Sequence, residues 1–208
     1  MTATMPTRDI AARLAAALDV DADDALSAQR SAFIERAVGE DLVDVSYRTL
    51  DSPFGLLLLA AGRNGLLRIA FELEDHAAVL ARLAIDVSPR LLESRRPLDA
   101  VARQLEEYFA GRRRRFDLHV DLRLARGFRR TVLDRLRDID YGTTRSYSDV
   151  AAAAGKPTAV RAAGSACAHN PIPVVVPCHR VVRGDGTIGN YLGGTAMKEA
   201  LLAMESAA

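Results

Sequence analysis

The sequence predicts an α+β protein of two domains: a small N-terminal domain with an antiparallel sheet, and an α-rich, winged-helix-like C-terminal domain with a helix-turn-helix. Short apolar runs separated by glycine- and proline-containing turns occupy the first half, which is typical of neighbouring antiparallel strands. Apolar residues at helical spacing occupy much of the second half. Two short helices there, joined by a tight glycine-bearing turn, have the dimensions of a helix-turn-helix.

The composition is that of a globular protein, with 208 residues of which 49% are hydrophobic and 26% charged. No apolar run approaches the roughly 18 residues that indicate a membrane-spanning helix, and the N-terminus lacks the layout of a secretory signal. The only cysteines, Cys167 and Cys178, are too few for a disulfide framework or a four-thiolate zinc site. We therefore expect a cytoplasmic protein with reduced thiols, no metal, no cofactor and no membrane association.

The formal net charge is +1, and the charges are not evenly spread along the chain. Basic residues slightly outnumber acidic ones in residues 127–208, and the reverse holds before them. This mild asymmetry permits nucleic-acid binding by the second half but does not demonstrate it.

Residues 1–40 form an Ala- and Asp-rich segment with a helical pattern around Ile10, Leu14 and Leu18. The pattern predicts a helical extension, to which we assign no chemistry.

Residues 41–122 are predicted to form the N-terminal α/β domain. Three apolar runs separated by turns predict an antiparallel meander: Asp41–Leu50, Gly55–Ala61 and Leu66–Phe71. Two stretches with helical spacing follow, Asp75–Ile85 and Leu98–Tyr108, and Gly111 is a typical helix stop. Alternation over Phe116–Leu122 predicts a further strand, and Arg123–Gly127 is the candidate linker.

Residues 127–208 are predicted to form the C-terminal domain, which opens with a helix over Phe128–Ile139. Ser146 is a candidate N-cap with Asp149 three residues later, so a helix should run from there to Ala154. After the turn, a second helix over Ala159–Ala168 is built from small residues. Arg161 is its one long cationic side chain.

A proline-bounded apolar run, Pro171–Pro177, reads as a buried strand that ends in Cys178 and His179. On spacing alone, such a Cys-His pair is more often structural than catalytic. Adjacent side chains on a strand point to opposite faces, but Pro177 makes a break in the strand plausible. A nearby histidine can lower the pKa of a thiol and make it a nucleophile. The histidine would itself need an orienting acid, for which both Glu205 and Asp185 are candidates.

Several motifs together resemble the O6-alkylguanine-DNA alkyltransferase family, the methylated-DNA–protein-cysteine methyltransferases. The resemblance is close over residues 127–208 and looser over 41–126. The motifs that carry it are Gly142-Thr143-Thr144-Arg145-Ser146-Tyr147, Ala159-Val160-Arg161-Ala162-Ala163-Gly164, Asn170-Pro171-Ile172-Pro173, Val176-Pro177-Cys178-His179-Arg180-Val181-Val182, Gly189-Asn190-Tyr191-x-Gly193-Gly194, Lys198-Glu199-x-Leu201-Leu202-x-x-Glu205 and, in the first half, Ser52-Pro53-Phe54-Gly55 and Leu105-x-x-Tyr108-Phe109-Ala110-Gly111.

The resemblance implies an RNase H-like N-terminal domain and a suicidal repair reaction, in which Cys178 irreversibly accepts the alkyl group of O6-alkylguanine or O4-alkylthymine in double-stranded DNA. His179 would act through a water as the base for the thiol, and Glu205 would hold the imidazole. Tyr147 would hydrogen-bond the flipped base and help to neutralise the departing guanine. Asn170 would fix the turn between the recognition helix and the acceptor.

The same resemblance implies binding in the minor groove, where small residues allow close approach and Arg161 replaces the extruded nucleotide. The residues implied at the DNA are Arg161, Tyr147, Ala162, Ala163 and Gly164. Those implied around the base are Val181 and Cys178, through their carbonyls, and the loop residues Asn190, Tyr191, Leu192, Gly193 and Gly194. Leu192 departs from the family, which often has serine there. A monomer without an obligate protein partner is expected.

Three other functions remain open from the residues. A non-catalytic alkylguanine-binding protein would signal to other repair proteins, although such relatives replace the acceptor cysteine that Cys178 retains. A helix-turn-helix transcription factor would leave Cys178 and His179 without a purpose. A Cys-His hydrolase would leave the arginine-bearing helix without one.

Overall fold

The computed structural model describes residue 26 and residues 28–207. Residues 44–207 form one compact unit, and the described residues before them belong to a second unit. In the latter, residues 28–39 are helical, whereas the predicted pattern around Ile10, Leu14 and Leu18 lies outside the described residues. Among the described residues, no helix has both the length and the apolarity that crossing a membrane requires.

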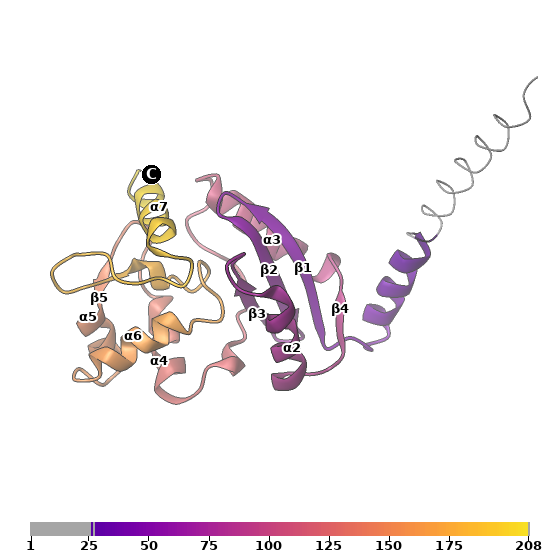
Figure 1. Ribbon diagram of the computed structural model, residues 1–208, viewed down its shortest axis with the longest axis horizontal. Helices are drawn as coiled ribbons and strands as arrows, with labels where there is room; N and C mark the ends of the chain where they lie inside the picture. The colour runs from indigo at the N-terminus through magenta and orange to yellow at the C-terminus, as the bar shows by residue number, and fades with distance from the viewer. Residues whose placement is uncertain (1–25, 27, 208) are drawn as a thin grey trace, which may run out of the picture. The chain divides into compact units, whose positions relative to one another are not determined.

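The sheet of the larger unit has the strand order β3-β2-β1-β4 (Figure 1). Strands β1 (Val45–Ser52), β2 (Gly55–Gly62) and β3 (Gly65–Ala70) form the predicted antiparallel meander. Strand β4 (Leu91–Glu93) was not predicted, and it pairs parallel with β1. The sheet is therefore mixed rather than wholly antiparallel. A strand as short as β4 carries no periodic signal of its own, because periodicity needs several residues.

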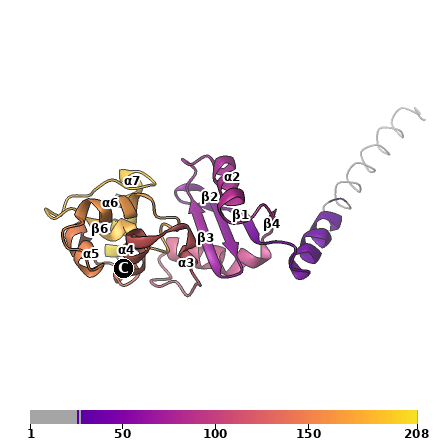
Figure 2. The same cartoon turned by 90° about the horizontal axis from the view of Figure 1, so that it is seen from below.

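The two helices predicted in the first half cover opposite faces of this sheet (Figures 1 and 2). Helix α2 (His76–Asp86) is capped by the Asp75 carboxylate, and its Leu83 packs in a cluster with Ala60 of β2. Helix α3 (Asp99–Phe109) packs on the other face, where β2 contributes Leu57 and Leu59. The alternation of β2 side chains between two faces thus gives each helix its own apolar surface.

The predicted strand over Phe116–Leu122 does not form. One isolated parallel bridge joins Leu66 to Val120, and the chain then turns through a short 3-10 helix, Leu122–Leu124. The edge of β3 has no room for a longer strand, because the amide of Ile69 donates to the carbonyl of Pro171 at 2.9 Å. The predicted linker that follows is partly buried rather than exposed, with Ala125 at 2% exposure.

The second half is mainly helical, as predicted. Its elements are α4 (Gly127–Leu136), β5 (Arg145–Ser146), α5 (Tyr147–Ala153), α6 (Val160–Ala168), β6 (Val181–Val182) and α7 (Thr195–Ser206). The capping box at the start of α5 is confirmed: Ser146 Oγ accepts from the Asp149 amide at 3.1 Å, and the Asp149 carboxylate accepts from the Ser146 amide at 3.0 Å. This cap fixes where α5 begins.

The predicted strand over Pro171–Pro177 is instead an irregular buried segment. Val174 has a φ of 72°, outside the extended region. The segment's backbone is held by Asn170, whose Oδ1 accepts from the Ile172 amide at 3.0 Å and whose Nδ2 donates to the Val176 carbonyl at 2.7 Å. Since prolines also lack the N–H that a strand ladder needs, one polar side chain replaces a neighbouring strand here.

One continuous apolar core joins the α3 face of the sheet to the second half. It includes Leu59 and Tyr108 from the first half and Ala151, Val176 and Leu201 from the second. Side chains from both halves of the sequence can therefore reach one buried site.

Candidate active site

Cys178 opens a 3-10 turn, Cys178–Arg180, directly after Pro177. The turn provides the predicted break in extended geometry, and the Cys178 amide donates back to the Val176 carbonyl at 2.8 Å. The side chain is 2% exposed, and its Sγ accepts a hydrogen bond from Asn170 Nδ2 at 3.1 Å. The thiol is thus held in place by the side chain that also organises the segment before it.

Burial raises the pKa of the Cys178 thiol to about 11, although the Asn170 hydrogen bond and the positive charge of Lys198 oppose this shift. A thiol with such a pKa is protonated near neutral pH. Since the thiolate is the nucleophile, chemistry at Cys178 requires a group that takes its proton.

His179 is fully buried, and its Nε2 lies 2.9 Å from Glu205 Oε1. Its Nδ1 is also buried and has no hydrogen-bond partner among the described residues. Burial lowers the pKa of His179, while the hydrogen bond to the Glu205 carboxylate opposes the shift. A neutral ring that donates from Nε2 to a carboxylate leaves Nδ1 with a lone pair for a proton.

Glu205 of α7 is the acid that reaches His179. Its carboxylate is 3% exposed and accepts from Arg180 Nη2 at 2.8 Å, from the Gly142 amide at 3.1 Å and from Tyr108 Oη at 2.6 Å. Burial raises the pKa of Glu205, but the hydrogen bonds from its partners outweigh burial and bring the pKa to about 2. The other candidate acid, Asp185, instead lies in an exposed turn and accepts from Thr187.

Tyr147, the first residue of α5, has its ring against Gly164 of α6. A Cβ at Gly189 would lie 2.8 Å from the Tyr147 hydroxyl, so glycine is required there for the hydroxyl to occupy its place. Lys198 Nζ lies 5.9 Å from the centre of the Tyr147 ring. Burial raises the pKa of Tyr147, which keeps the phenol protonated as a donor.

Lys198 of α7 is fully buried, and its Nζ donates to the Val181 carbonyl at 2.5 Å. Burial lowers the pKa of Lys198, against the opposing effect of the cysteines. The carbonyl that the resemblance assigns to the substrate is therefore already engaged by a lysine. A carbonyl oxygen has two lone pairs, so one remains for a second donor.

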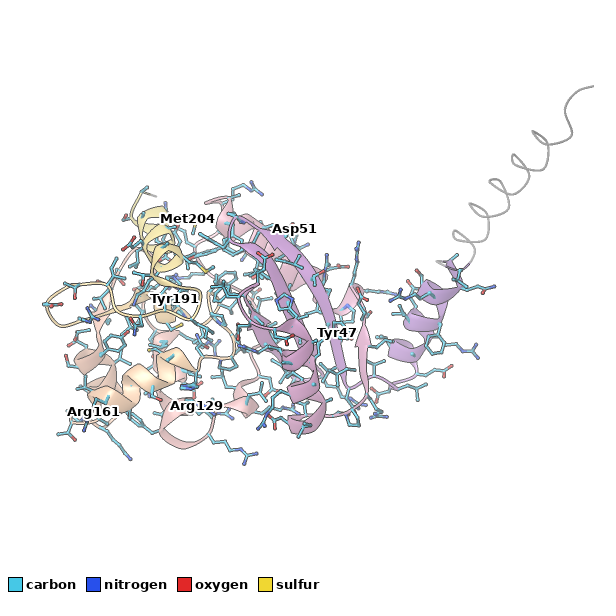
Figure 3. All side chains as sticks on the ribbon, in the orientation of Figure 1. Tyr47, Asp51, Arg129, Arg161, Tyr191 and Met204 are labelled. Carbon is cyan, nitrogen blue, oxygen red and sulfur yellow. The ribbon has the colours of Figure 1, made fainter. Side chains whose placement is uncertain are left out.

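Tyr191 lies in the loop before α7 (Figure 3), and its ring is close to aromatic rings from both halves of the sequence. Its ring lies 5.8 Å from the ring of Phe71 and 6.3 Å from that of His179. The Tyr191 hydroxyl is buried and has no hydrogen-bond partner among the described residues. Asn190 is exposed, Leu192 is half-buried, and Gly193 and Gly194 complete the loop, Gly194 with a φ of 88°.

On α6, Arg161 lies at the outer surface (Figure 3), and Ala162 beside it is exposed. Gly164 is half-buried against Tyr147. Ala163 is 0% exposed and faces the core, so its side chain does not lie on the surface that carries Arg161. We therefore remove Ala163 from the predicted interface, because the helix turns by about 100° per residue and carries this side chain from the exposed face into the core.

Two residues that donate hydrogen bonds to the buried Glu205 carboxylate were not assigned a role from the sequence. Tyr108 reads there as a core aromatic at helical spacing, and nothing local indicates that its hydroxyl meets Glu205. Arg180 follows His179 directly, but only the fold brings its guanidinium to the Glu205 carboxylate and, at 2.6 Å, to the Ile139 carbonyl.

Comparisons with known proteins match both halves of the chain. Residues 127–207 match the 6-O-methylguanine DNA methyltransferase, DNA binding domain, and residues 45–122 match the 6-O-methylguanine DNA methyltransferase, ribonuclease-like domain. A methylated-DNA–protein-cysteine methyltransferase of Mycolicibacterium paratuberculosis is 42% identical over 161 residues, which are 77% of this chain and 92% of the relative.

Solved structures give the same result. The crystal structure of Mycobacterium tuberculosis O6-methylguanine methyltransferase matches with a TM-score of 0.69 and 37% identity, over 78% of this chain and 93% of that one. The structure of Mycobacterium tuberculosis OGT in complex with DNA matches with a TM-score of 0.68 at the same identity and coverage.

Proposed function

The chain belongs to the 6-O-methylguanine DNA methyltransferase family, and we propose on this premise that Cys178 is its alkyl acceptor. The protein binds DNA and repairs it by transferring the alkyl group of O6-alkylguanine to one of its own cysteines. The observation that carries the assignment is the buried Cys178 thiol, held by Asn170 and followed by the paired His179 and Glu205.

The proton of the thiol leaves first, through a bridging water, to the lone pair on His179 Nδ1. Glu205, which remains ionised, stabilises the imidazolium that forms. Cys178 Sγ then attacks the alkyl carbon, a C–S bond forms, and the bond from that carbon to guanine O6 breaks with its electron pair on the base. Tyr147 donates a hydrogen bond to the departing guanine. The thioether at Cys178 is chemically inert, so each molecule reacts once.

The target base reaches the thiol by leaving the duplex. Helix α6 enters the minor groove with the exposed Arg161 and Ala162, and the arginine fills the space of the extruded nucleotide. Extrusion costs a few kcal/mol, and less at a damaged pair, which favours the lesion over normal guanine. O4-alkylthymine is a second substrate of the same pocket.

The extruded base is held by the loop Asn190–Gly194 and by the carbonyls of Cys178 and Val181. Tyr191 supports this role, because its buried hydroxyl has no partner among the described residues and such groups normally have one. The half-buried Leu192 makes the edge of the pocket apolar.

We also propose the roles of the domains, the oligomeric state and the location of the protein. Residues 41–122 and 127–208 act as the two family domains on one shared core, and residues 1–40 are an extension to which we assign no function. The protein works as a monomer in the cytoplasm, where thiols stay reduced.

The test is intact-mass analysis after incubation with a duplex containing O6-methylguanine. One methyl increment, mapped to Cys178 by peptide analysis, is the expected result. An unchanged mass with the duplex still bound and methylated would indicate a non-catalytic binding protein. An unchanged mass with demethylated DNA would indicate a hydrolase.

A further inference from the structure

Tyr108 is a first-half residue in direct contact with the buried charge network. It lies on α3, is 0% exposed, and its Oη is 2.6 Å from Glu205 Oε1 and 3.4 Å from His179 Nε2. The phenol therefore touches both the acid and the base of the candidate site, although it comes from the other half of the sequence.

The proton positions around this contact follow from charge. Glu205 is ionised and only accepts hydrogen bonds, so the Tyr108 hydroxyl must donate to it. The remaining lone pairs of the phenol oxygen, together with Glu205 Oε1, face His179 Nε2. Two acceptors at one ring nitrogen favour the tautomer in which that nitrogen carries the proton.

We propose that Tyr108 is a positioning residue that, with Glu205, fixes His179 in the tautomer with the proton on Nε2 and the lone pair on Nδ1. The proposal rests on the proposed function, in which Nδ1 takes the thiol proton. It assigns to the first half of the chain a part in the chemistry and not only in the fold.

The other groups near the Glu205 carboxylate make contacts that differ from that of Tyr108. Arg180 and the Gly142 amide occupy other directions of the carboxylate. Tyr141, a second phenol nearby, donates instead to the Met204 carbonyl at 3.5 Å and lies against the Arg180 guanidinium. The titratable and charged groups around His179 are Glu205 and Lys198 of α7, Arg180 and Cys178 beside it, Tyr108 of α3 and Tyr191 of the loop.

The experiment compares Tyr108→Phe with the matched control Tyr141→Phe. Each variant removes one phenol hydroxyl and keeps the ring, which preserves the packing of the core. The rate of transfer from free O6-benzylguanine is measured against pH in single-turnover reactions, so that DNA binding does not enter. Thermal unfolding of each variant reports its stability separately.

We expect Tyr108→Phe to react about tenfold more slowly, the factor of a lost hydrogen bond to a charged group. The acid limb of its pH–rate profile should move to higher pH, because a Glu205 carboxylate with one donor fewer holds the proton of His179 more strongly. Tyr141→Phe should keep the rate and profile of the parent. A Tyr108→Phe profile that superimposes on that of the parent overturns the proposal, whatever its stability.

A second measurement on the parent holds even if Tyr108→Phe fails to fold. The ¹⁵N shifts of the His179 ring should show the proton on Nε2 near neutral pH, and a proton on Nδ1 would overturn the proposal. Failure of the proposed function looks different: the parent itself would not acquire the benzyl group on Cys178.

Discussion

The side-chain amide of Asn170 lies 3.1 Å from the sulfur of Cys178 and joins the acceptor to the end of α6. Asn170 is 1% exposed, and its other hydrogen bonds go to the Val176 carbonyl and the Ile172 amide. The helix that carries Arg161 and the thiol are thus connected through one buried side chain.

Asn170→Ala should weaken both the fold and the reaction. It leaves the buried Ile172 amide unpaired and takes one of the two donors from the Val176 carbonyl, which costs about 1 to 3 kcal/mol of unfolding free energy. It also removes a donor that lowers the pKa of Cys178, so the thiol becomes harder to ionise and transfer slows. Urea unfolding and single-turnover transfer measure the two effects. Ser165→Ala, an exposed change on the same helix, should alter neither; a normal transfer rate in Asn170→Ala would contradict the role.

Cys178→Ser should abolish alkyl transfer while DNA binding persists, because a hydroxyl is a far poorer nucleophile than a thiol. Cys167→Ser should still accept one alkyl group. Cys167 is buried on α6, and burial raises the pKa of its thiol. Mass spectrometry of both variants after reaction measures the outcome. An alkyl group found on Cys167, or on the Cys178→Ser chain, would refute the assignment.

Arg161→Ala should slow transfer from duplex DNA much more than transfer from free O6-benzylguanine. An inserted arginine supports the extruded state, and about 1.4 kcal/mol of lost support already means tenfold in rate. Arg103→Ala, an exposed arginine change on α3, is the control. The measurement is the ratio of the two rates in each variant. Equal losses on duplex and free base would show that Arg161 does not act in extrusion.

Unfolding free energy should fall as the pH drops below 6.5. The pKa of His179 is lower in the folded state than its ordinary 6.5. As the pH falls below 6.5, the unfolded chain therefore binds a proton at His179 before the folded chain does, and this lowers the unfolding free energy. Glu205 acts next: its folded pKa is about 2 against an ordinary 4.5, so its contribution is complete above 4.5 and is lost between 4.5 and about 2. Urea unfolding across this pH range measures both.

Glu205→Gln should flatten the lower part of that curve and lower stability at neutral pH by about 3 kcal/mol or more, because it leaves Arg180 buried without its anion. Asp44, paired with Arg90, also has a pKa of about 2 and titrates in the same window. Asp44→Asn is therefore the matched control, and it should flatten the curve without affecting alkyl transfer. An unchanged slope in Glu205→Gln would contradict the low pKa.

The sequence by itself predicted the local structure and the chemistry-bearing residues. The antiparallel meander came from apolar runs separated by turns, and helices α3 and α4 came from apolar residues at helical spacing. The start of α5 came from the capping box at Ser146. These elements depend on neighbours in the chain, so local patterns are enough to reveal them. Cys178 and His179 were candidates from their place after the apolar run, and the resemblance to the family implied their roles and that of Arg161.

Only the tertiary structure decided which distant groups meet. The residues alone left Glu205 and Asp185 open as partners of His179, and the fold places Glu205 there, as the resemblance implied. It also brings Tyr108 to the same carboxylate and turns Ala163 into the core. It also replaced the two predicted strands that precede the linker and Cys178 with irregular segments, because β3 and Asn170 already bind the backbone groups involved. Contacts between residues far apart in the sequence depend on how the two halves pack on one core, and no local pattern records that packing.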